Sequence, residues 1–258
     1  MGEADRMALG ADRQTPRLKV FLTGASGKVG RVLAPAFRAA YELRTLYRRP
    51  APEDPNAVLA GMDDRAKLHS LMEGMDVIVH LAAVSKEARF AEDVVPPNIV
   101  GVYNTFEAAT EAGVRRIVYA SSCHVVGFKT TRYTIEVTDS FQPETTYGVS
   151  KAFGEVLGRY YHDHLGMEFV AIRIGWLLPY DDPDLRTSES KRRIWLSPRD
   201  AVSLFRLAIE KPEVGYTVVF GTSITSQEIL SLRSAREVLG YEPQDDVVAL
   251  YGPEACER

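Results

Sequence analysis

Two side chains that could share proton-transfer chemistry stand four residues apart in the segment ETTYGVSKAFGE, residues 144–155. If this segment is helical, Tyr147 and Lys151 lie at positions i and i+4 and share one face. A phenol with a pKa of about 10 is a poor base at neutral pH, and a neighbouring ammonium favours the phenolate. The pair is therefore a candidate acid–base pair. The same spacing also occurs by chance on helix surfaces, so the rest of the chain must decide.

The elements that would position this pair alternate along the chain. Short apolar runs rich in β-forming residues predict strands, and the segments between them have helical periodicity. The predicted strands are 18–23, 42–47, 76–83, 115–122 and 168–175, and the predicted helices are 28–40, 98–113 and 146–166. Such alternation predicts an α/β fold with a doubly wound parallel sheet of the Rossmann type, in which ligands bind outside the carboxyl ends of the strands.

A glycine-rich turn, TGASGKVG, directly follows the first predicted strand. Its glycines, Gly24, Gly27 and Gly30, would let the backbone approach a pyrophosphate and would point free helix N–H groups at it. We therefore expect this loop to bind a dinucleotide cofactor. The other loop residues expected to contribute are Ser26, Lys28 and Val29. A tight strand–helix turn that is merely rich in glycine is the alternative.

The end of the second strand, LYRRP, bears on which dinucleotide binds. Enzymes of this build that use NAD usually place an acid here to hold the ribose 2′-hydroxyl. Arg48 could instead pair with a 2′-phosphate, so the sequence favours NADP over NAD as the cofactor. The alternative is that Arg48 and Arg49 simply end a solvated loop.

The composition argues against several other classes of protein. The chain has 258 residues, a net charge of −4 and a pI near 5.8, which argues against binding nucleic acid through bulk positive charge. No apolar run reaches the roughly 18 residues of a membrane helix, so we expect no membrane partner. Two distant cysteines, Cys123 and Cys256, fit a reducing cytoplasm, and no CxxC or HExxH motif supports a metal site. Residues 1–16 are expected to form a mobile leader before a single domain, 17–258.

Several motifs in a fixed order resemble a known enzyme family. The glycine loop, HLAAVS, NIVGVYN, YASSCHVVG, YGVSK and RIG are similar to the extended short-chain dehydrogenase/reductase superfamily, also called the NAD-dependent epimerase/dehydratase family. The resemblance covers roughly residues 18–245. Within that family the chain looks most similar to the compact sugar dehydrogenases, which include uronate dehydrogenase and NAD-dependent glucose-6-phosphate dehydrogenase. SSCHVVG, LGRYYHDH, IWLSPRD and REVLGYEPQD carry that likeness.

This resemblance implies oxidation of the anomeric C1 of a small sugar to a lactone by a Ser-Tyr-Lys site. Tyr147 would take the proton from the C1 hydroxyl, Ser122 would orient that hydroxyl, and Lys151 would also hold the nicotinamide ribose. Only about 80 residues follow RIG, which leaves room for a uronate, a sugar phosphate or a free sugar. Carbonyl reduction, epimerisation and dehydration on the same scaffold remain alternatives. A cofactor-sensing protein without turnover is less favoured, because such proteins commonly lose the tyrosine or the lysine.

The resemblance also implies a substrate lobe and an assembly. The lobe would come from about 176–198 and 222–258. Family members often pair two long helices, so a homodimer is expected, with the helix 146–166 as a candidate contributor.

Further site residues follow from the same resemblance. Those expected along the cofactor are Leu81, Ala82, Asn98 and Ile174, and those expected against the substrate are Ser85, Cys123, His124, Trp176 and Arg186. Core packing is the alternative for Leu81, Ala82 and Ile174, and a helix N-cap is the alternative for Asn98. A backbone-bonded strand-end histidine is the alternative for His124. The arginine fork of Arg186 would suit a carboxylate or phosphate, although the SESKRR run beside it is more typical of a solvated loop.

Three positions depart from the sugar dehydrogenase pattern. Cys123 stands where that group has asparagine, Trp176 stands where uronate dehydrogenase has a small serine, and Gly61 stands where the family usually has an aspartate near the adenine. These changes bear on the identity of the sugar and leave Ser122 and the Tyr-Lys pair intact. We expect the Cys123 thiol to be half-buried and inert.

Overall fold

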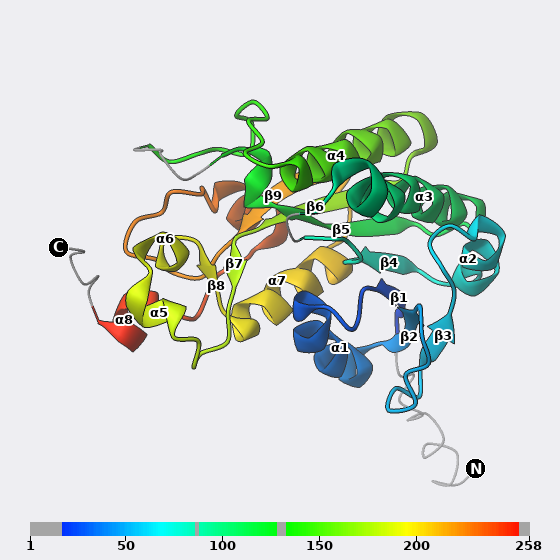
Figure 1. The fold of residues 1–258 in the computed structure, drawn as a ribbon, viewed down its shortest axis with the longest axis horizontal. Helices are drawn as coiled ribbons and strands as arrows, with labels where there is room; N and C mark the ends of the chain where they lie inside the picture. The colour runs from blue at the N-terminus through cyan, green and yellow to red at the C-terminus, as the bar shows by residue number, and fades with distance from the viewer. Residues whose placement is uncertain (1–16, 86–87, 128–132, 253–258) are drawn as a thin grey trace, which may run out of the picture.

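The computed structural model describes residues 17–85, 88–127 and 133–252, so the expected leader, 1–16, and Cys256 lie outside the described residues. Seven parallel strands form one sheet in the order β3-β2-β1-β4-β5-β6-β9 (Figure 1). The strands are β1 (Lys19–Thr23), β2 (Glu42–Tyr47), β3 (Ala57–Leu59), β4 (Val77–His80), β5 (Arg116–Ser122), β6 (Glu168–Ile174) and β9 (Tyr216–Gly221). The order runs outward in both directions from β1 and β4, which confirms the predicted doubly wound sheet.

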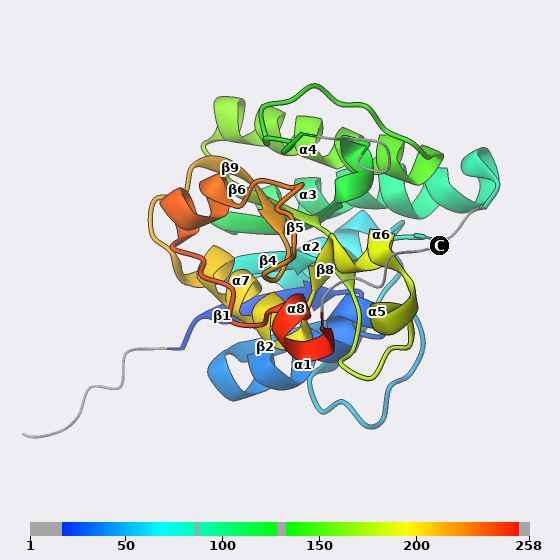
Figure 2. The same cartoon turned by 90° about the vertical axis from the view of Figure 1, so that its left-hand side faces the viewer.

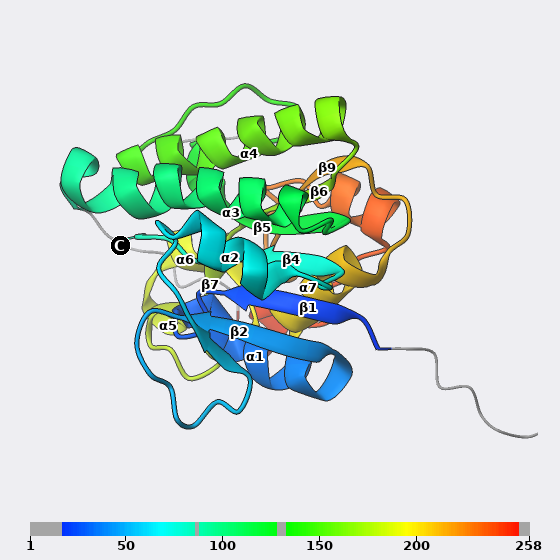
Figure 3. The same cartoon turned by 90° about the vertical axis from the view of Figure 1, so that its right-hand side faces the viewer.

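Helices cover both faces of this sheet. One face carries α1 (Lys28–Ala40) and α7 (Pro198–Glu210), and the other carries α2 (Arg65–Met72), α3 (Gly101–Glu111) and α4 (Thr146–Leu165). Figure 3 shows α3 and α4 running side by side on the face opposite α1. Two short helical segments, 90–94 and 96–100, lead into α3.

The central strands are buried on both faces, which is why their sequences read as unbroken apolar runs. Every residue of β5 is buried. Val118 packs into the core shared with α1 and α7, whereas Ile117 and Tyr119 pack into the core shared with α3. In α1 the buried residues Gly30, Leu33, Ala34 and Phe37 follow the helical period of a single apolar stripe.

A small group of elements lies beyond the carboxyl ends of the strands (Figure 2). It contains β7 (Trp176–Leu177) paired with β8 (Trp195–Leu196), together with α5 (Asp184–Thr187), α6 (Glu189–Arg192) and α8 (Val247–Tyr251). Leu185, Trp195 and Val247 form its separate apolar core. The Ser223 N–H donates to the Trp195 carbonyl at 2.7 Å, so the segments 176–198 and 222–252 are joined directly.

Most of the predicted elements are present within a few residues of their expected limits. The fourth strand in chain order, β4, is shorter than the expected 76–83 because the chain leaves the sheet after His80. The backbone N–H groups of Leu81 and Ala82 are instead bonded to Thr23 Oγ1 at 3.2 Å each. The predicted helix 98–113 begins as α3 only at Gly101. In the described part of the chain, no helix is long and apolar enough to cross a membrane.

Candidate active site

The glycine loop between β1 and α1 has a shape that requires glycine. Gly24 has a φ of +73°, and a Cβ there would lie 2.7 Å from the Ala82 nitrogen. A Cβ on Gly30 would lie 2.6 Å from Ala25 backbone atoms. Helix α1 begins after Gly27 with no side-chain cap and no acid in its first turn. Its free N–H groups and positive dipole end therefore suit a phosphate, so the loop fits the pyrophosphate of a dinucleotide.

The loop opens onto a cavity of about 390 Å³ at the carboxyl ends of the strands. The predicted site residues that line this cavity are Gly24, Gly27, Lys28, Val29, Gly30, Leu81, Ser85, Ser122, Cys123, His124, Tyr147, Lys151, Ile174 and Trp176. Residues predicted from five separate parts of the chain thus meet around one space. The described lining includes two lysines and no acidic side chain, which suits anionic ligands.

The start of α4 brings Tyr147 next to Ser122. Thr145 caps the helix by accepting a hydrogen bond from the Gly148 N–H at 3.0 Å. A Cβ on Gly148 would collide with the carbonyl oxygen of His124, so the first turn of α4 packs directly against the segment that follows β5. Ser122 ends β5, and its hydroxyl accepts a hydrogen bond from the His124 N–H at 3.3 Å. The predicted catalytic trio is therefore assembled at one edge of the sheet.

Burial is the largest influence on the pKa values of the Tyr-Lys pair. It lowers the pKa of Lys151 to about 7, and the nearby charge of Glu155 acts in the opposite direction. It raises the pKa of Tyr147 above its ordinary value, and a hydrogen bond with Ser122 offsets part of that rise. The expectation that the lysine draws the phenol's pKa down is thus corrected. The Lys151 Nζ lies 5.7 Å from the Tyr147 ring centroid, and the desolvation of the phenol dominates.

Cys123 lies beside this trio as a neutral thiol. Its side chain is buried more completely than expected, and burial raises its pKa to about 12. A thiol with this pKa carries almost no thiolate at neutral pH, in line with the expected inertness.

Aromatic rings continue the cavity away from Tyr147. The ring centroids of His124 and Tyr147 are 6.1 Å apart, and those of His124 and Trp176 are 6.3 Å apart, with edge-to-face orientations. His124 Nδ1 lies 3.8 Å from a carboxylate oxygen of Glu144. This end of the cavity therefore combines flat apolar faces with polar edges.

Asn98 is a correction, because it lies behind the cavity and does not line it. Its side chain is 1% exposed, and its Oδ1 accepts a hydrogen bond from the Val84 N–H at 2.8 Å. Its Nδ2 donates to the Val84 carbonyl and to Ser150 Oγ, each at 3.0 Å. All of its hydrogen-bonding groups are occupied by protein partners. Asn98 thus ties the loop after β4 to α4, and it is neither a direct cofactor contact nor an N-cap.

Arg186 is a second correction. It lies on α5 with its guanidinium 5.7 Å from the Tyr251 ring centroid, and it does not line the cavity. Lys191, from the SESKRR run, lies closer to the site, with its Nζ 5.4 Å from the ring centroid of Trp176 and an ion pair to Asp184. Residues 189–192 of this run form α6, in which Arg192 is 4% exposed while Glu189 and Ser190 are exposed, so the run is only partly solvated.

Three further predicted cofactor residues, besides Asn98, are outside the cavity lining. Ser26 is exposed on the glycine loop, and Arg48 is exposed directly after β2. Ala82 packs its backbone against Gly24. Near Gly61, the Asp63 carboxylate folds back so closely that it would collide with a Cβ at that position.

Sequence reasoning missed a layer of buried polar residues beneath the cavity. The Glu155 carboxylate on α4 accepts hydrogen bonds from Arg173 of β6 and from Ser121 of β5. His80 and Tyr119, on β4 and β5, are fully buried under Lys151. A glutamate four residues after Lys151 and a histidine closing an apolar strand were the available signals.

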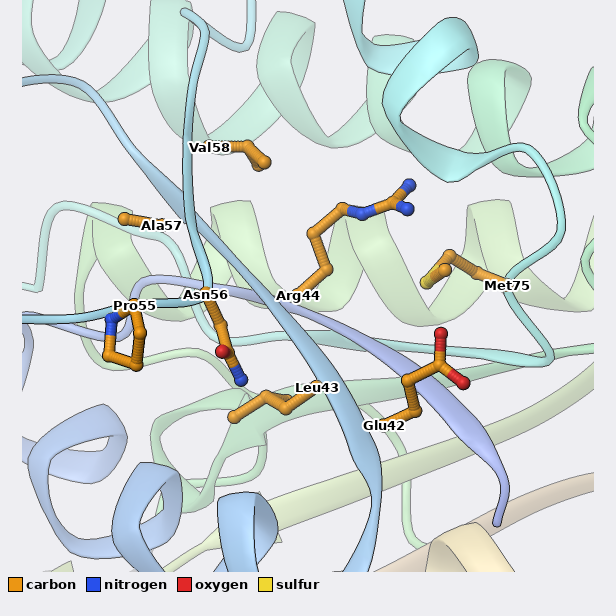
Figure 4. Close-up of a pocket in the computed structure, with 8 residues that line it drawn as sticks. All are labelled: Glu42, Leu43, Arg44, Pro55, Asn56, Ala57, Val58 and Met75. Atoms are coloured by element: carbon orange, nitrogen blue, oxygen red, sulfur yellow. The ribbon is translucent and has the colours of Figure 1, made fainter. Parts of the chain in front are cut away.

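Neither of two other features points to a different site. A more open hollow of about 260 Å³ lies at the amino ends of β2 and β3 (Figure 4). There Arg44 donates a hydrogen bond to the Leu71 carbonyl. Ligands of such sheets bind at the opposite edge. Among the residues that the structure describes, no group of three or more His, Cys, Asp or Glu side chains is placed to hold a metal ion.

Residues 20–183 match the model of the NAD dependent epimerase/dehydratase family. The chain belongs to that family. This confirms the resemblance drawn from the motifs.

Several known proteins are similar to this chain over most of its length. An NAD-dependent glucose-6-phosphate dehydrogenase from Haloferax volcanii is 36% identical over 247 residues, spanning 88% of this chain and 93% of the relative. A uronate dehydrogenase from Pseudomonas syringae pv. tomato is 37% identical over 244 residues, spanning 93% and 86%. A mutant uronate dehydrogenase from Agrobacterium tumefaciens, solved in complex with NAD, superposes with a TM-score of 0.81 at 33% identity, covering 90% and 86%.

Proposed function

We propose that this protein is an NAD(P)-dependent dehydrogenase that oxidises the anomeric C1 of a small sugar to a lactone. The observation that carries the proposal is the meeting of Ser122, Tyr147 and Lys151 at a cavity that also includes the glycine loop. The relatives support it, because they are named as sugar dehydrogenases and align over most of their length.

The chain's own side chains have separate roles in this reaction. When bound, the oxidised nicotinamide supplies the hydride acceptor. Ser122 orients the C1 hydroxyl and stabilises charge that develops on its oxygen. Tyr147 removes the hydroxyl proton as a general base. Lys151 holds the nicotinamide ribose. The hydrogen bond between Ser122 and Tyr147 opposes the effect of burial on the pKa of Tyr147.

The size and lining of the cavity support a monosaccharide as substrate. The segments 176–198 and 222–252 would form a small substrate lobe, and Trp176 and His124 offer faces for a sugar ring. A uronate, a sugar phosphate and a free sugar all remain candidates. The proposed arginine ligand for an acidic group, Arg186, lies outside the cavity lining.

A panel of sugars tests this function directly. Purified protein is mixed with free sugars, sugar phosphates and uronates, with NAD and NADP in parallel, and the absorbance of reduced nicotinamide is followed. We expect one class of sugar to give a signal. Silence across the panel, with cofactor binding demonstrated separately, would refute sugar oxidation and favour carbonyl reduction or epimerisation on the same scaffold.

Arg48 supports NADP as the preferred cofactor. Its exposed guanidinium follows β2 directly, where it could pair with a 2′-phosphate. We expect Arg48→Ala to weaken NADP binding by about tenfold or more, because a hydrogen bond to a charged group is lost, and to leave NAD binding unchanged. Fluorescence titration with both reduced cofactors measures this. Arg49→Ala, which removes the adjacent exposed arginine, is the matched control. An equal loss for both cofactors would contradict the assignment.

The outer faces of α3 and α4 support a homodimer. Val149, Val156 and Tyr160 on α4 are 46%, 58% and 54% exposed. Val100, at the end of the segment 96–100, and Tyr103, on α3, are 46% and 43% exposed. Paired with the same face of a second copy, these side chains would form the core of a four-helix interface.

A charge on this face should break the dimer. We expect Val156→Glu to convert the protein to a monomer in light scattering at micromolar concentration, because a buried unpaired carboxylate is costly. Leu250→Glu, at a position on α8 that is 50% exposed, should leave the assembly unchanged. A wild-type protein that is already monomeric would refute this interface.

A further inference from the structure

The ammonium of Lys151 is buried without a carboxylate of its own. Its side chain is 1% exposed, and among the described residues no acceptor forms a hydrogen bond or ion pair with Nζ. Glu155 lies one helical turn further on, but its Oε2 binds the Arg173 guanidinium at 2.8 Å. A buried charge destabilises the folded protein unless another group compensates it.

An aromatic face supplies the closest compensation. Nζ of Lys151 lies 4.6 Å from the ring centroid of Tyr119, closer than its 5.7 Å to the ring centroid of Tyr147. A cation within about 6 Å of a ring face is attracted by the ring's negative face, most strongly where water is excluded. Lys151 therefore lies between a fixed ring below it and the reacting phenol beside it.

The ring of Tyr119 is held by four elements. It stacks on His80 of β4 with centroids 5.9 Å apart and an angle of 20°. Phe106 of α3 meets it edge-on at 5.8 Å, and Phe169 of β6 lies at 6.0 Å. From α4, Gly154 provides the space for its hydroxyl end, where a Cβ would collide with the ring. Tyr119 is fully buried, so this ring presents one fixed face to Lys151.

Two polar atoms of this layer have no partner among the described residues, namely the Tyr119 hydroxyl and His80 Nε2. A buried polar atom without a partner costs stability, so simple packing would favour phenylalanine at residue 119. Thr23 Oγ1 accepts two backbone N–H bonds and lies 3.2 Å from His80 Nδ1.

The uncharged state of His80 matters for the lysine. Burial, reinforced by the charge of Lys151, lowers the pKa of His80 to about 3, so the ring stays neutral at working pH. The groups that face Lys151 are then the neutral His80 and Tyr119 from the sheet, with Tyr147 and the arginine-paired Glu155 from α4. None of these groups brings a second positive charge toward the ammonium.

We propose that Tyr119, backed by neutral His80, is a positioning residue whose ring face holds the Lys151 ammonium where it meets the cofactor and Tyr147. The inference rests on the proposed function for the role of Lys151. It adds a requirement that the Ser-Tyr-Lys trio does not contain, namely an aromatic face under the lysine.

Binding of NADH tests this inference without any sugar. Fluorescence titrations between pH 6 and about pH 10 compare the wild type with Tyr119→Leu, Tyr119→Phe and Lys151→Met. We expect the NADH affinity of the wild type to fall at alkaline pH as Lys151 loses its proton; this fall is the alkaline limb of the pH profile. Lys151→Met should lack the alkaline limb. Tyr119→Leu should bind NADH about tenfold more weakly at pH 7, with the limb moved down by about one pH unit. Tyr119→Phe, which keeps the ring face, should stay within about twofold of wild type.

Phe169→Leu separates positioning from packing. Phe169 belongs to the same buried cluster and contacts the Tyr119 ring, but it does not face Lys151. We expect it to lose as much thermal stability as Tyr119→Leu while the alkaline limb stays at its wild-type pH. The inference is overturned if Tyr119→Phe is as damaging as Tyr119→Leu, or if Tyr119→Leu leaves the limb unmoved. A shifted limb together with silence across the sugar panel would support the inference and refute sugar oxidation.

Discussion

Replacing Tyr147 by phenylalanine is expected to lower kcat by about 10³-fold while NADH affinity stays within about twofold of wild type. General-base catalysis contributes about 10²–10⁴-fold, and the substitution removes the only group that we assign to take the proton. The phenylalanine ring keeps the packing against His124, whose ring centroid lies 6.1 Å away. The binding of cofactor should therefore survive the change.

The measurement combines initial rates, read as absorbance of reduced nicotinamide, with NADH fluorescence titration of the same preparations. Tyr41→Phe is a matched control. It removes a hydroxyl that donates to Glu210 on the far side of the sheet, so it should cost some stability and no turnover. A Tyr147→Phe enzyme within tenfold of wild-type kcat would show that another group removes the proton.

The direction of the pH profile adds a second expectation for the same residue. Burial raises the pKa of Tyr147, so activity of the wild type should rise with pH across the neutral range as the phenolate forms. The hydrogen bond with Ser122 opposes that rise in pKa. Ser122→Ala should therefore move the rising limb to higher pH as well as lower the rate.

The sequence predicted those parts of the site that depend on local spacing. Gly24 and Gly30 follow a strand directly, and Tyr147 and Lys151 are one helical turn apart, so chain geometry alone places them. The carboxyl ends of parallel strands share one edge, which is why Ser122 and Ile174 could be placed near one another from their strand ends. The cavity lining contains all of these residues.

Side chains outside such patterns could not be placed from the sequence. The direction of Arg186 depends on how α5 meets α8, and the contact with Tyr251 joins residues far apart in the chain. Asn98 looked like a helix start, yet it lies in a short helical segment before α3 and is bonded to Val84 and Ser150. Both positions are set by tertiary packing, which no short motif encodes.

The pKa values of Tyr147 and Lys151 also could not be predicted from the sequence. Spacing shows that an ammonium lies near a phenol, which predicts a lowered phenol pKa. It does not show how much protein surrounds the two groups. In the structure both lie in a dense environment, and the loss of water is the largest influence on each pKa. His80 and Tyr119 were missed for a related reason, because they read as ordinary members of buried strands.

Lys151→Met is expected to make the cofactor-free protein more stable while lowering kcat/KM by about 10²-fold or more. Burial lowers the pKa of Lys151 from 10.5 to about 7. At 1.36 kcal/mol per pKa unit, this corresponds to roughly 5 kcal/mol of destabilisation at pH 7, as an upper limit. Methionine has a similar length and no charge, so it should fill the space with little strain. Recovering about 2 kcal/mol of this penalty should raise Tm by about 4–8 °C, because 1 kcal/mol shifts Tm by about 2–4 °C in a domain of this size.

The stability gained by Lys151→Met should depend on pH in a predictable direction. Between pH 7 and 10.5 the unfolded chain holds a proton on Lys151 that the folded protein releases, so wild-type stability rises with pH in that window. The stabilising effect of Lys151→Met should therefore be largest at pH 7 or below and shrink toward pH 10.5. Thermal melts across this range measure the effect. Lys67→Met, at an exposed lysine of α2, is the control and should have the same Tm as wild type at each pH. A lower Tm for Lys151→Met at pH 7 would mean that the ammonium stabilises the fold, and its burial would then not be a cost accepted for function.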